Sequence, residues 1–401
     1  MMWERVKLGD VSDSCLGKML DQRKNKGTYK PYLANVNVRW GAFDLDNLQE
    51  MKFEDDEDER YGIKYGDLII CEGGEPGRCA IWKEQLPNMK IQKALHRLRV
   101  NEEMDYRYVY YWFLLAGKQG ALKQYYTGAT IMHMPGQKLK EVVIDKPPLD
   151  VQRKIGDYLE AFDDLIENNQ KQIKLLEEAA QRLYKEWFVD LHFPGYEDVE
   201  IVDGVPEGWS KGKAENFFNI TIGKTPPRAE KQWFVKNNIG VPWVSISDMG
   251  NAGVYVFETS EDLTQEAVKK YNMKVVPSGT IFVSFKLTVG RVSIATKNMC
   301  TNEAIAHFYI DDDSKQAYTY CYLNNFEYDT LGNTSSISKA INSKIIKAMP
   351  FVMPDEVTIL AFDRLVAPIL KTIKNKLEVC IKLKEARDRL LPKLMSGEIK
   401  V

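Results

Sequence analysis

The sequence has almost no excess charge of either sign, with 55 Lys and Arg against 57 Asp and Glu and a formal net charge of −2. Histone-like and other polybasic nucleic-acid binders carry a large positive excess, so this balance argues against that class. Long apolar runs are also missing. The longest, at residues 108–116, is far shorter than the roughly 20 residues that cross a bilayer. The first residues show no charged-then-apolar pattern of a secretory signal.

Cysteine and histidine are sparse as well. The chain has six cysteines and four histidines, with no Cys-x-x-Cys motif and no closely spaced histidines. This pattern argues against a structural zinc site, and we expect no metal ligand in this chain. Scattered cysteines without an export signal predict reduced thiols in a cytoplasmic protein. The remaining composition, 44% hydrophobic and 28% charged over 401 residues, is globular and provides for two or three domains.

An internal repeat organises the chain. It is clearest where residues 66–78 match residues 279–291, because each stretch holds an apolar strand-like run, a loop and a Gly-Arg pair. A second short strand is predicted after each, at 79–82 and at 292–295. Further matches keep the same order: Trp3 and Gly17-Lys18 with Trp209 and Gly223-Lys224, 92–95 with 302–305, and 108–110 with 318–320. One weak match would be noise, but an ordered series indicates duplication.

Each half ends in a long amphipathic helix whose apolar positions alternate in spacing between four and three residues. The seam positions are Ile155, Leu159, Phe162, Ile166, Asn169, Ile173, Leu176 and Leu183 in the first helix, and Phe362, Val366, Ile369, Ile373, Lys376, Leu383 and Leu390 in the second. This heptad pattern favours a coiled coil of the two helices over ordinary core packing, because two similar long helices can be partners. The polar residues Asn169 and Lys376 occupy equivalent positions, where they cost stability but fix the register.

The predicted fold class is therefore α+β, with two tandem mixed α/β domains and a pseudo-twofold internal repeat. The domains are expected at 1–147 and 193–353, and the helices at 148–192 and 354–401. We expect the helices to separate the domains and to form an antiparallel coiled coil. A helix of about 40 residues is ~60 Å long at 1.5 Å per residue. That length fits two DNA half-sites about one and a half to two turns apart.

Several apparent catalytic motifs are incomplete. Gly223-Lys224-Thr225 looks like the end of a phosphate-binding loop, but Phe218 stands where that loop needs glycine. Pro226-Pro227 follow where its helix would start. The stretch 145–148, Asp-Lys-Pro-Pro, lacks the aromatic residue of an amino-methyltransferase motif. No Ser/His/Asp or Cys/His arrangement has recognisable spacing. We therefore expect no catalytic residue and no enzymatic activity of the chain by itself.

With catalytic motifs set aside, the remaining sequence features are residues suited to DNA recognition. Predicted loops in both halves mix basic, aromatic, hydroxyl and glycine residues, which bind phosphates and base edges and let the backbone approach DNA closely. The candidate DNA-binding residues are Lys18, Arg23, Lys24, Lys26, Gly73, Gly74, Arg78, Gln92, Tyr125, Tyr126, Thr127 and Thr130 in the first half, and Lys224, Arg228, Lys286, Thr288, Arg291, Asn302, Ser335 and Lys339 in the second. For any single residue, a solvated loop charge or a turn glycine is the alternative interpretation.

Two acidic runs require a separate expectation. Residues 54–59 are six consecutive acids, and residues 311–313 are three consecutive aspartates. We expect both runs to face away from DNA phosphates, and plain solvation of exposed loops is the alternative. Near-neutrality then does not exclude DNA. It favours a chain that supplies specificity while partner subunits supply much of the salt-dependent affinity.

Three stretches carry a resemblance to a known family: 66–78, Pro-Leu-Asp-Val-Gln-Arg-Lys-Ile at 148–155, and Leu-Leu-Pro-Lys-Leu-Met-Ser-Gly-Glu-Ile at 390–399. Together with the tandem plan, they resemble the specificity subunits of type I restriction–modification enzymes over essentially the whole chain. The resemblance implies two target recognition domains, each reading one part of a bipartite DNA sequence. It also implies two conserved helical regions that set the spacer between these parts. The second helix departs from the family pattern, because Thr358 stands roughly where the first has Gln152.

The same resemblance implies partners and their cofactors. Two modification subunits would dock on this chain and carry S-adenosylmethionine and the adenine methylation chemistry. Restriction subunits would add ATP- and Mg-dependent translocation and cleavage, while this chain would bind no cofactor itself. Two other classes stay open from the sequence: a self-contained DNA methyltransferase or nuclease with an unrecognised site, and a coiled-coil protein-interaction scaffold.

Overall fold

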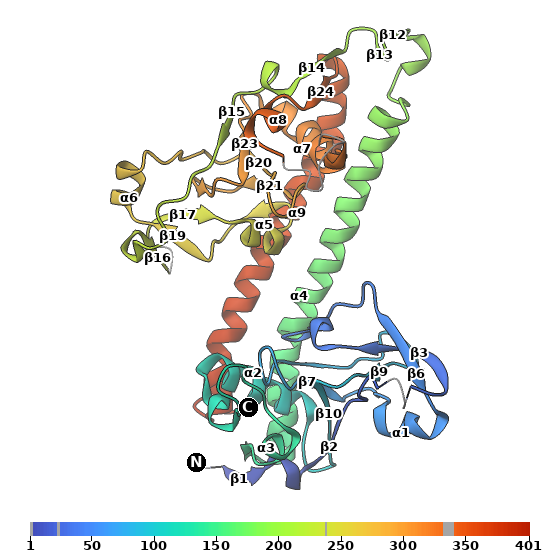
Figure 1. Ribbon diagram of the computed structural model, residues 1–401, viewed down its shortest axis with the longest axis vertical. Helices are drawn as coiled ribbons and strands as arrows, with labels where there is room; N and C mark the ends of the chain where they lie inside the picture. The colour runs from blue at the N-terminus through green and yellow to red at the C-terminus, as the bar shows by residue number, and fades with distance from the viewer. Residues whose placement is uncertain (1–2, 22–24, 237–238, 332–340) are drawn as a thin grey trace. The chain divides into compact units, whose positions relative to one another are not determined.

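The structure, a computed structural model, describes residues 3–21, 25–236, 239–331 and 341–401. The chain forms two compact units. Unit 1 consists of Met1–Ile166 and Lys382–Val401, and unit 2 consists of Glu167–Ile381. Each unit contains one α/β domain together with a section of each of two long helices, α4 (Leu149–Tyr184) and α9 (Glu356–Met395) (Figure 1).

Unit 1 is built around an antiparallel sheet of order β2-β10-β7-β8, beside a sheet of order β6-β3-β9 and the pairs β1-β11 and β4-β5. The strands are β1 (Glu4–Lys7), β2 (Ser12–Leu16), β3 (Thr28–Leu33), β4 (Val38–Arg39), β5 (Ala42–Phe43), β6 (Gln49–Phe53), β7 (Leu68–Cys71), β8 (Cys79–Ile81), β9 (Lys90–Ile91), β10 (Leu95–Val100) and β11 (Val143–Lys146). The short helices are α1 (Asp58–Tyr61), α2 (Tyr106–Gln119) and α3 (Gly136–Lys140).

Local chemistry explains the elements that matter for the site. Strand β7 is a run of four apolar residues, all buried, as expected for a strand covered on both faces. The N-cap of helix α2 is Asp105, whose carboxylate accepts from the backbone N–H groups of Arg107 and Tyr108. It ends at Gly120, whose φ of 71° is the left-handed conformation of a helix C-cap.

Unit 2 has a five-stranded sheet of order β15-β23-β20-β21-β18, a sheet of order β16-β19-β17-β22, and the pairs β12-β13 and β14-β24. The strands are β12 (Ile201–Val202), β13 (Val205–Pro206), β14 (Ser210–Lys213), β15 (Ile220–Ile222), β16 (Phe234–Val235), β17 (Val241–Val244), β18 (Tyr255–Val256), β19 (Glu261–Leu263), β20 (Ile281–Ser284), β21 (Val292–Ala295), β22 (Cys300–Thr301), β23 (Ile305–Phe308) and β24 (Pro350–Met353). The short helices are α5 (Ile246–Ala252), α6 (Gln265–Lys270), α7 (Gln316–Asn325) and α8 (Ser343–Lys347).

The predicted duplication is confirmed in atomic detail. The loop between β7 and β8 closes when Gly77 N donates to Cys71 O at 2.9 Å, and the loop between β20 and β21 closes when Gly290 N donates to Ser284 O at 2.9 Å. These two glycines have φ of 88° and 87°, a conformation that disfavours any residue with a Cβ. Both predicted second strands, now β8 and β21, are present. The two units therefore share one backbone plan.

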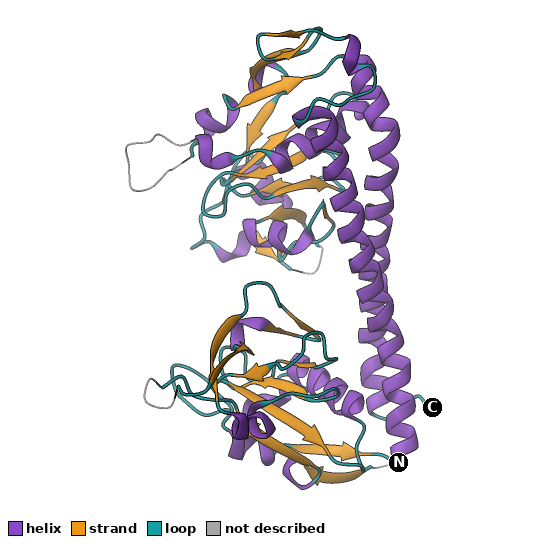
Figure 2. Cartoon of the chain, turned by 90° about the vertical axis from the view of Figure 1, so that its right-hand side faces the viewer, coloured by secondary structure: helices purple, strands orange, loops and turns teal. Residues whose placement is uncertain are grey.

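The helices α4 and α9 run antiparallel as an adjacent pair (Figure 2). In unit 2 the Trp187 and Phe362 ring centroids lie 5.7 Å apart, so the π-helical turn that follows α4 (Lys185–Val189) meets the start of α9. In unit 1 Asp163, farther back along α4, pairs with Arg387, farther along α9. Of the predicted seam, Ile155, Leu159, Ile166, Ile173, Phe362, Val366 and Ile373 are buried, and Phe162, Leu176, Leu183, Ile369, Leu383 and Leu390 are half-buried.

The two polar seam residues meet in unit 2. The Lys376 Nζ atom donates to Asn169 Oδ1 at 3.3 Å. Each polar side chain thereby has a hydrogen-bond partner in a largely apolar interface, a contact that the sequence analysis did not predict. No helix among the described residues combines the length and the apolarity that crossing a membrane requires.

Candidate nucleic-acid interface

In unit 2, predicted recognition residues gather where the loop after β15 meets sheet β16-β19-β17-β22. The Arg228 guanidinium carbon lies 4.3 Å from the Phe234 ring centroid and 4.5 Å from that of Trp243. Its Nη1 donates to Glu261 Oε2 at 2.5 Å, and its side chain remains 52% exposed. Stacking on aromatic rings and a carboxylate partner hold the guanidinium in one orientation at the surface. A fixed, accessible guanidinium is suited to a guanine edge or a phosphate.

A second group lies beside it. The Thr225 hydroxyl donates to Glu303, in the turn between β22 and β23. Burial raises the pKa of the Glu303 carboxyl, but the Thr225 hydrogen bond and the charges of Lys286 and Arg228 outweigh burial and lower it overall. The two cations and the carboxylate are thus close enough to interact electrostatically. The structure brings these candidates together, along with Lys224, whose Nζ donates to Tyr271 O at 2.7 Å.

In unit 1 the β7–β8 loop forms the corresponding edge. Arg78 Nη2 donates to Asn35 O at 3.2 Å and to Asn35 Oδ1 at 3.1 Å, and Asn35 Nδ2 donates to Gly73 O at 2.9 Å. Gly73 and Thr127 both form bridges with His133, which brings the predicted segment around Thr127 to this edge. Arg78 is therefore a brace of the loop, and the neighbouring Gly74 is exposed at its tip.

Lys18 is a correction to the predicted set. It is only 4% exposed, its Nζ donates to Glu57 Oε2 at 2.5 Å and to Lys52 O at 2.9 Å, and it lies 5.0 Å from the Phe53 ring centroid. A buried, paired ammonium cannot reach a phosphate without leaving these partners. We therefore assign Lys18 to the interior of the first domain and not to the DNA-facing edge.

Two acids of the run 54–59 pair with lysines of the first domain. Asp58 accepts from Lys30 at 2.7 Å and pairs with Lys90 at 3.2 Å, and Lys90 is 3% exposed. Burial raises the pKa of Asp58, but the hydrogen bonds from both lysines lower it overall. Together with Glu57 on Lys18, this carboxylate neutralises buried lysines, so these two acids are structural counterions and not simply a solvated surface.

Several other predicted residues hold loops in place. Arg291 Nη1 donates to Ile246 O at 2.5 Å, Tyr126 OH donates to Pro76 O at 2.6 Å, Tyr125 OH accepts from Val143 N at 3.1 Å, and Asn302 Oδ1 accepts from Ala304 N at 3.0 Å. Gln92 forms a parallel bridge with Lys18 through its backbone. Lys26, Thr130 and Thr288 are exposed. Arg23, Lys24, Ser335 and Lys339 lie outside the described residues.

Sequence reasoning missed the aromatic and acidic partners of the second edge. Nothing in the sequence placed Trp243 against Arg228. The same holds for Phe234, Glu261 and Glu303, which come from other strands and turns. A stacking platform for an arginine is assembled by strand pairing, so its members have no common spacing in the sequence.

The buried titratable groups of the sheets have structural surroundings. Burial lowers the pKa of His307 to about 4, and the ring bonds Thr221 Oγ1 at 2.9 Å and Thr301 Oγ1 at 2.7 Å. Burial raises the pKa of the Cys71 thiol to about 11 and that of Cys300 to about 12. Among the residues that the structure describes, no group of three or more His, Cys, Asp or Glu side chains is placed to hold a metal ion.

The fold and the two edges define a class of protein: a tandem repeat in which two α/β domains with unlike recognition loops are joined to one antiparallel helix pair. Comparison with known proteins identifies the family within this class. The family model described as the type I restriction modification DNA specificity domain matches residues 2–178 and again residues 206–384. The chain belongs to this family.

Known relatives agree over nearly full length. The chain is 31% identical over 354 residues to the type I restriction enzyme MjaIX specificity subunit of Methanocaldococcus jannaschii, covering 84% of this chain and 78% of the relative. It is 28% identical to the type I restriction enzyme HindI specificity subunit of Haemophilus influenzae, covering 99% of each. The crystal structure of the S subunit of a type I restriction–modification system from M. genitalium has the same fold, with a TM-score of 0.55, 15% identity and coverage of 98% and 96%.

Proposed function

We propose that this chain is the DNA specificity subunit of a type I restriction–modification complex. Each α/β domain reads one part of a bipartite target, and partner subunits perform adenine methylation and cleavage at the site so chosen. The observation that supports this proposal is that the two domains share one backbone fold but have different side chains in the equivalent loops at the candidate DNA-facing edge. Gly73 and Gly74 of the β7–β8 loop correspond to Lys286 and Leu287 of the β20–β21 loop. Unlike side chains on a shared scaffold suit a pair of readers for two unlike sequences.

The charge distribution supports division of labour within the complex. Arg228 is an exposed cation next to Glu261, and Lys286 is an exposed cation near Glu303. Such mixed edges discriminate base edges better than they bind phosphate, because the carboxylates repel the backbone. We therefore infer that partner subunits contribute much of the salt-dependent affinity.

The long helices provide the surface for those partners. Tyr158 and Leu175 on α4 are 58% and 64% exposed, and Val357 on α9 is 78% exposed. Large apolar side chains at this exposure on a helix suit coverage by another subunit. We propose that two modification subunits, which hold S-adenosylmethionine, dock on the helices. Restriction subunits, which use ATP and Mg²⁺, complete the complex, and this chain holds no cofactor.

Exchange of the first domain tests the proposal. Residues 1–147 would be replaced by the corresponding segment of a relative with a different target, and the methylated motif would be mapped by sequencing of modified adenines. We expect one half of the motif to change while the other half and the spacer stay the same. A motif that changes in both halves, or in neither, would contradict the modular assignment.

A further inference from the structure

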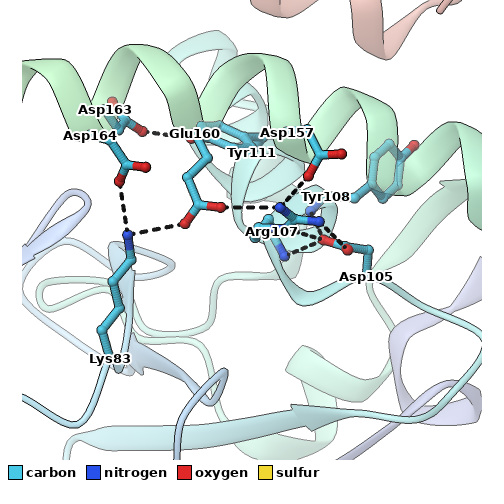
Figure 3. A network of polar contacts seen from close by, with 9 residues as sticks. All are labelled: Lys83, Asp105, Arg107, Tyr108, Tyr111, Asp157, Glu160, Asp163 and Asp164. Atoms are coloured by element: carbon cyan, nitrogen blue, oxygen red, sulfur yellow. Dashed lines mark hydrogen bonds and ion pairs between the residues drawn. The ribbon is translucent and has the colours of Figure 1, made fainter.

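The joint between the first α/β domain and helix α4 is ionic, and Arg107 lies at its centre (Figure 3). On the domain side, Arg107 Nε and Nη2 donate to the two oxygens of Asp105 at 3.1 and 2.9 Å. On the helix side, its Nη1 donates to Asp157 Oδ1 at 2.5 Å and to Glu160 Oε2 at 3.1 Å. One guanidinium thus binds the N-cap residue of α2 and two carboxylates of α4. The hydrogen bonds to these carboxylates raise the Arg107 pKa, so the group stays charged.

Lys83, which follows β8, makes a second connection to the same helix. Its Nζ lies 3.0 Å from Glu160 Oε1 and 3.4 Å from Asp164 Oδ1. Glu160 therefore receives a cation from each of two segments of the domain, with Lys83 on one oxygen and Arg107 on the other. Residues 157, 160 and 164 share one face of α4, because positions three and four apart are neighbours on a helix.

A third connection reaches α9. Tyr111 OH donates to Asp163 Oδ2 at 2.7 Å, and the other oxygen of Asp163 accepts from Arg387. Arg387 Nη2 pairs with Asp388 Oδ1 at 3.0 Å, and Asp388 pairs with Lys118 at the end of α2. This set of contacts, from Tyr111 to Lys118, begins and ends on the domain and passes through both helices. Every carboxylate at its centre has a cation or a hydroxyl partner.

At the positions that correspond to Arg107 and Tyr111 the joint of unit 2 is apolar, although Asn325 Nδ2 of α7 donates to Gln181 Oε1 of α4 at 2.8 Å. Tyr318 OH donates to Val352 O as Tyr108 OH donates to Asp145 O, and this pair of bonds aligns α7 with α2. In that alignment Arg107 corresponds to Ala317, which is 1% exposed, and Tyr111 corresponds to Cys321, which is 0% exposed. Both belong to the hydrophobic core that includes the end of α4 and the start of α9.

Both joints contain apolar residues at aligned positions where the domain contacts the helices. In unit 2 Phe188 contacts Tyr318 and Phe362, with ring centroids 4.7 and 4.9 Å apart. In unit 1 the aligned residues Met395, Tyr108 and Ile155 belong to one buried cluster. Apolar contact therefore attaches both domains to the helices, and the ionic contacts of unit 1 are additional to it.

We propose that Arg107 is a positioning residue that fixes the rotational setting of the first α/β domain on α4, and so determines which bases of the first half-site the β7–β8 loop edge meets. This inference rests on the proposed function. Apolar contact is non-directional and does not select one angle as hydrogen bonds do. Charged hydrogen bonds from a planar guanidinium to three carboxylates allow one angle. The second domain has interlocking aromatic rings at this place and needs no such device.

The test uses the complete complex with its modification subunits. Duplexes that carry the bipartite target would be varied one base pair at a time, and initial methylation rates would give the discrimination at each position. For Arg107→Ala we expect discrimination across the first half-site to fall by roughly tenfold, the factor for one charged hydrogen bond. Discrimination across the second half-site should match the wild type. The ratio between half-sites is the readout, because general loss of folded protein lowers both equally.

Three further variants make the result specific. Arg5→Ala removes a cation of the same domain that lies 3.9 Å from Asp145 and is 71% exposed, and it should change neither half-site. Arg107→Lys keeps the charge without the planar fork and should recover part of the loss. If Arg107→Ala does not fold, Glu160→Gln removes one charged acceptor at constant shape and should reduce first-half discrimination roughly threefold.

Each result decides the question. Selective loss at the first half-site supports the positioning role. Equal loss at both half-sites, or none, overturns it and leaves the proposed function intact. A wild-type complex that methylates no bipartite sequence overturns the proposed function itself, and this inference with it.

Discussion

The two halves of the repeat share a backbone fold but have chemically different side chains at equivalent positions. At four aligned pairs of positions, unit 1 has a cation or a phenol where unit 2 has a neutral small or aromatic side chain: Lys90 and Cys300, Arg97 and His307, Arg107 and Ala317, and Tyr111 and Cys321. The cations of unit 1 are not isolated. Arg97 Nη2, for example, donates to Asp13 Oδ2 at 2.6 Å, and Arg97 is 4% exposed.

The comparison shows that one backbone fold accepts chemically different buried side chains at equivalent positions. A buried cation is tolerated only with a carboxylate partner, so each exchange in unit 1 required a second residue elsewhere. Asp58, Asp13 and Asp105 supply these partners from three separate segments. At these positions unit 2 avoids the desolvation cost of charge and relies on close packing of neutral side chains. We expect the two units to respond differently to the same kinds of perturbation.

The largest expected effect is deletion of a ring from the joint of unit 2. Phe362 is 0% exposed and contacts Phe188 and Trp187. Phe362→Ala should lower the free energy of unfolding by about 3–5 kcal/mol, because it leaves a large cavity. Urea titration would measure it, with the 78% exposed Val357→Ala as the control expected to change little. A loss below 1 kcal/mol for Phe362→Ala would show that rings do not hold this joint.

A second test uses the pH dependence of stability, to which a buried histidine of unit 2 should contribute. Burial lowers the pKa of His307 from its ordinary 6.5 to about 4. The unfolded chain then binds a proton that the folded one does not, so stability is complete above pH 6.5 and declines as pH falls toward 4. At 1.36 kcal/mol per unit, the loss approaches about 3 kcal/mol. The measurement is urea unfolding at pH 7 and pH 4.5 for the wild type and His307→Gln.

The variant should lose less stability than the wild type over this interval, while the exposed His192→Gln should behave as the wild type does. If His307→Gln and the wild type have the same pH dependence, the buried neutral imidazole does not account for the acid sensitivity of unit 2.

The paired turn glycines test the shared backbone. A Cβ on Gly77 would lie 2.4 Å from Leu122 Cδ1, and a Cβ on Gly290 would lie 2.9 Å from Tyr328 Cδ2. Both have positive φ, so alanine should cost about 1–3 kcal/mol at each, with Gly77→Ala the more severe. Gly195 also has positive φ, with nothing within 4 Å of its Cβ position, so Gly195→Ala reports backbone strain alone. Thermal unfolding of the three variants would rank them, and an equal cost at all three would show that crowding contributes nothing.

The smallest expected effect concerns the polar pair of the helix seam. Replacing Asn169 and Lys376 together by leucine should leave the free energy of unfolding within about 1 kcal/mol or raise it slightly, because an apolar pair avoids desolvation of the charge. The register should become less defined. Methylation of targets with lengthened or shortened spacers would detect this as wider spacer tolerance. Unchanged tolerance would mean that this pair does not fix the register.

The predictable parts of the fold were those that depend on local pattern. The apolar run of β7, the strands β8 and β21 and the helix that begins at Tyr106 each follow from residues adjacent in the chain. The candidate site was predictable in part, because loops at equivalent places in a repeat could be aligned. Arg228 and Lys286 both act on the Glu303 carboxylate, a proximity that the alignment did not predict. The prediction of Lys18 as a DNA-binding residue was wrong, because Lys18 is buried and paired with Glu57, nearly forty residues away in the sequence.

The sequence by itself determined the duplication, the two long helices and their polar seam positions, because periodicity and repeated spacing are written along the chain. Tertiary structure alone decided which charges are buried and which are presented. Ion pairs such as Arg107 with Asp157 and Glu160 join residues whose separation in sequence has no pattern, and their energy depends on how far the fold removes them from water. For the same reason, only the tertiary structure could show that Arg228 stacks on Trp243. Only it could distinguish an arginine that holds its loop in place, such as Arg78, from one that is available to contact DNA.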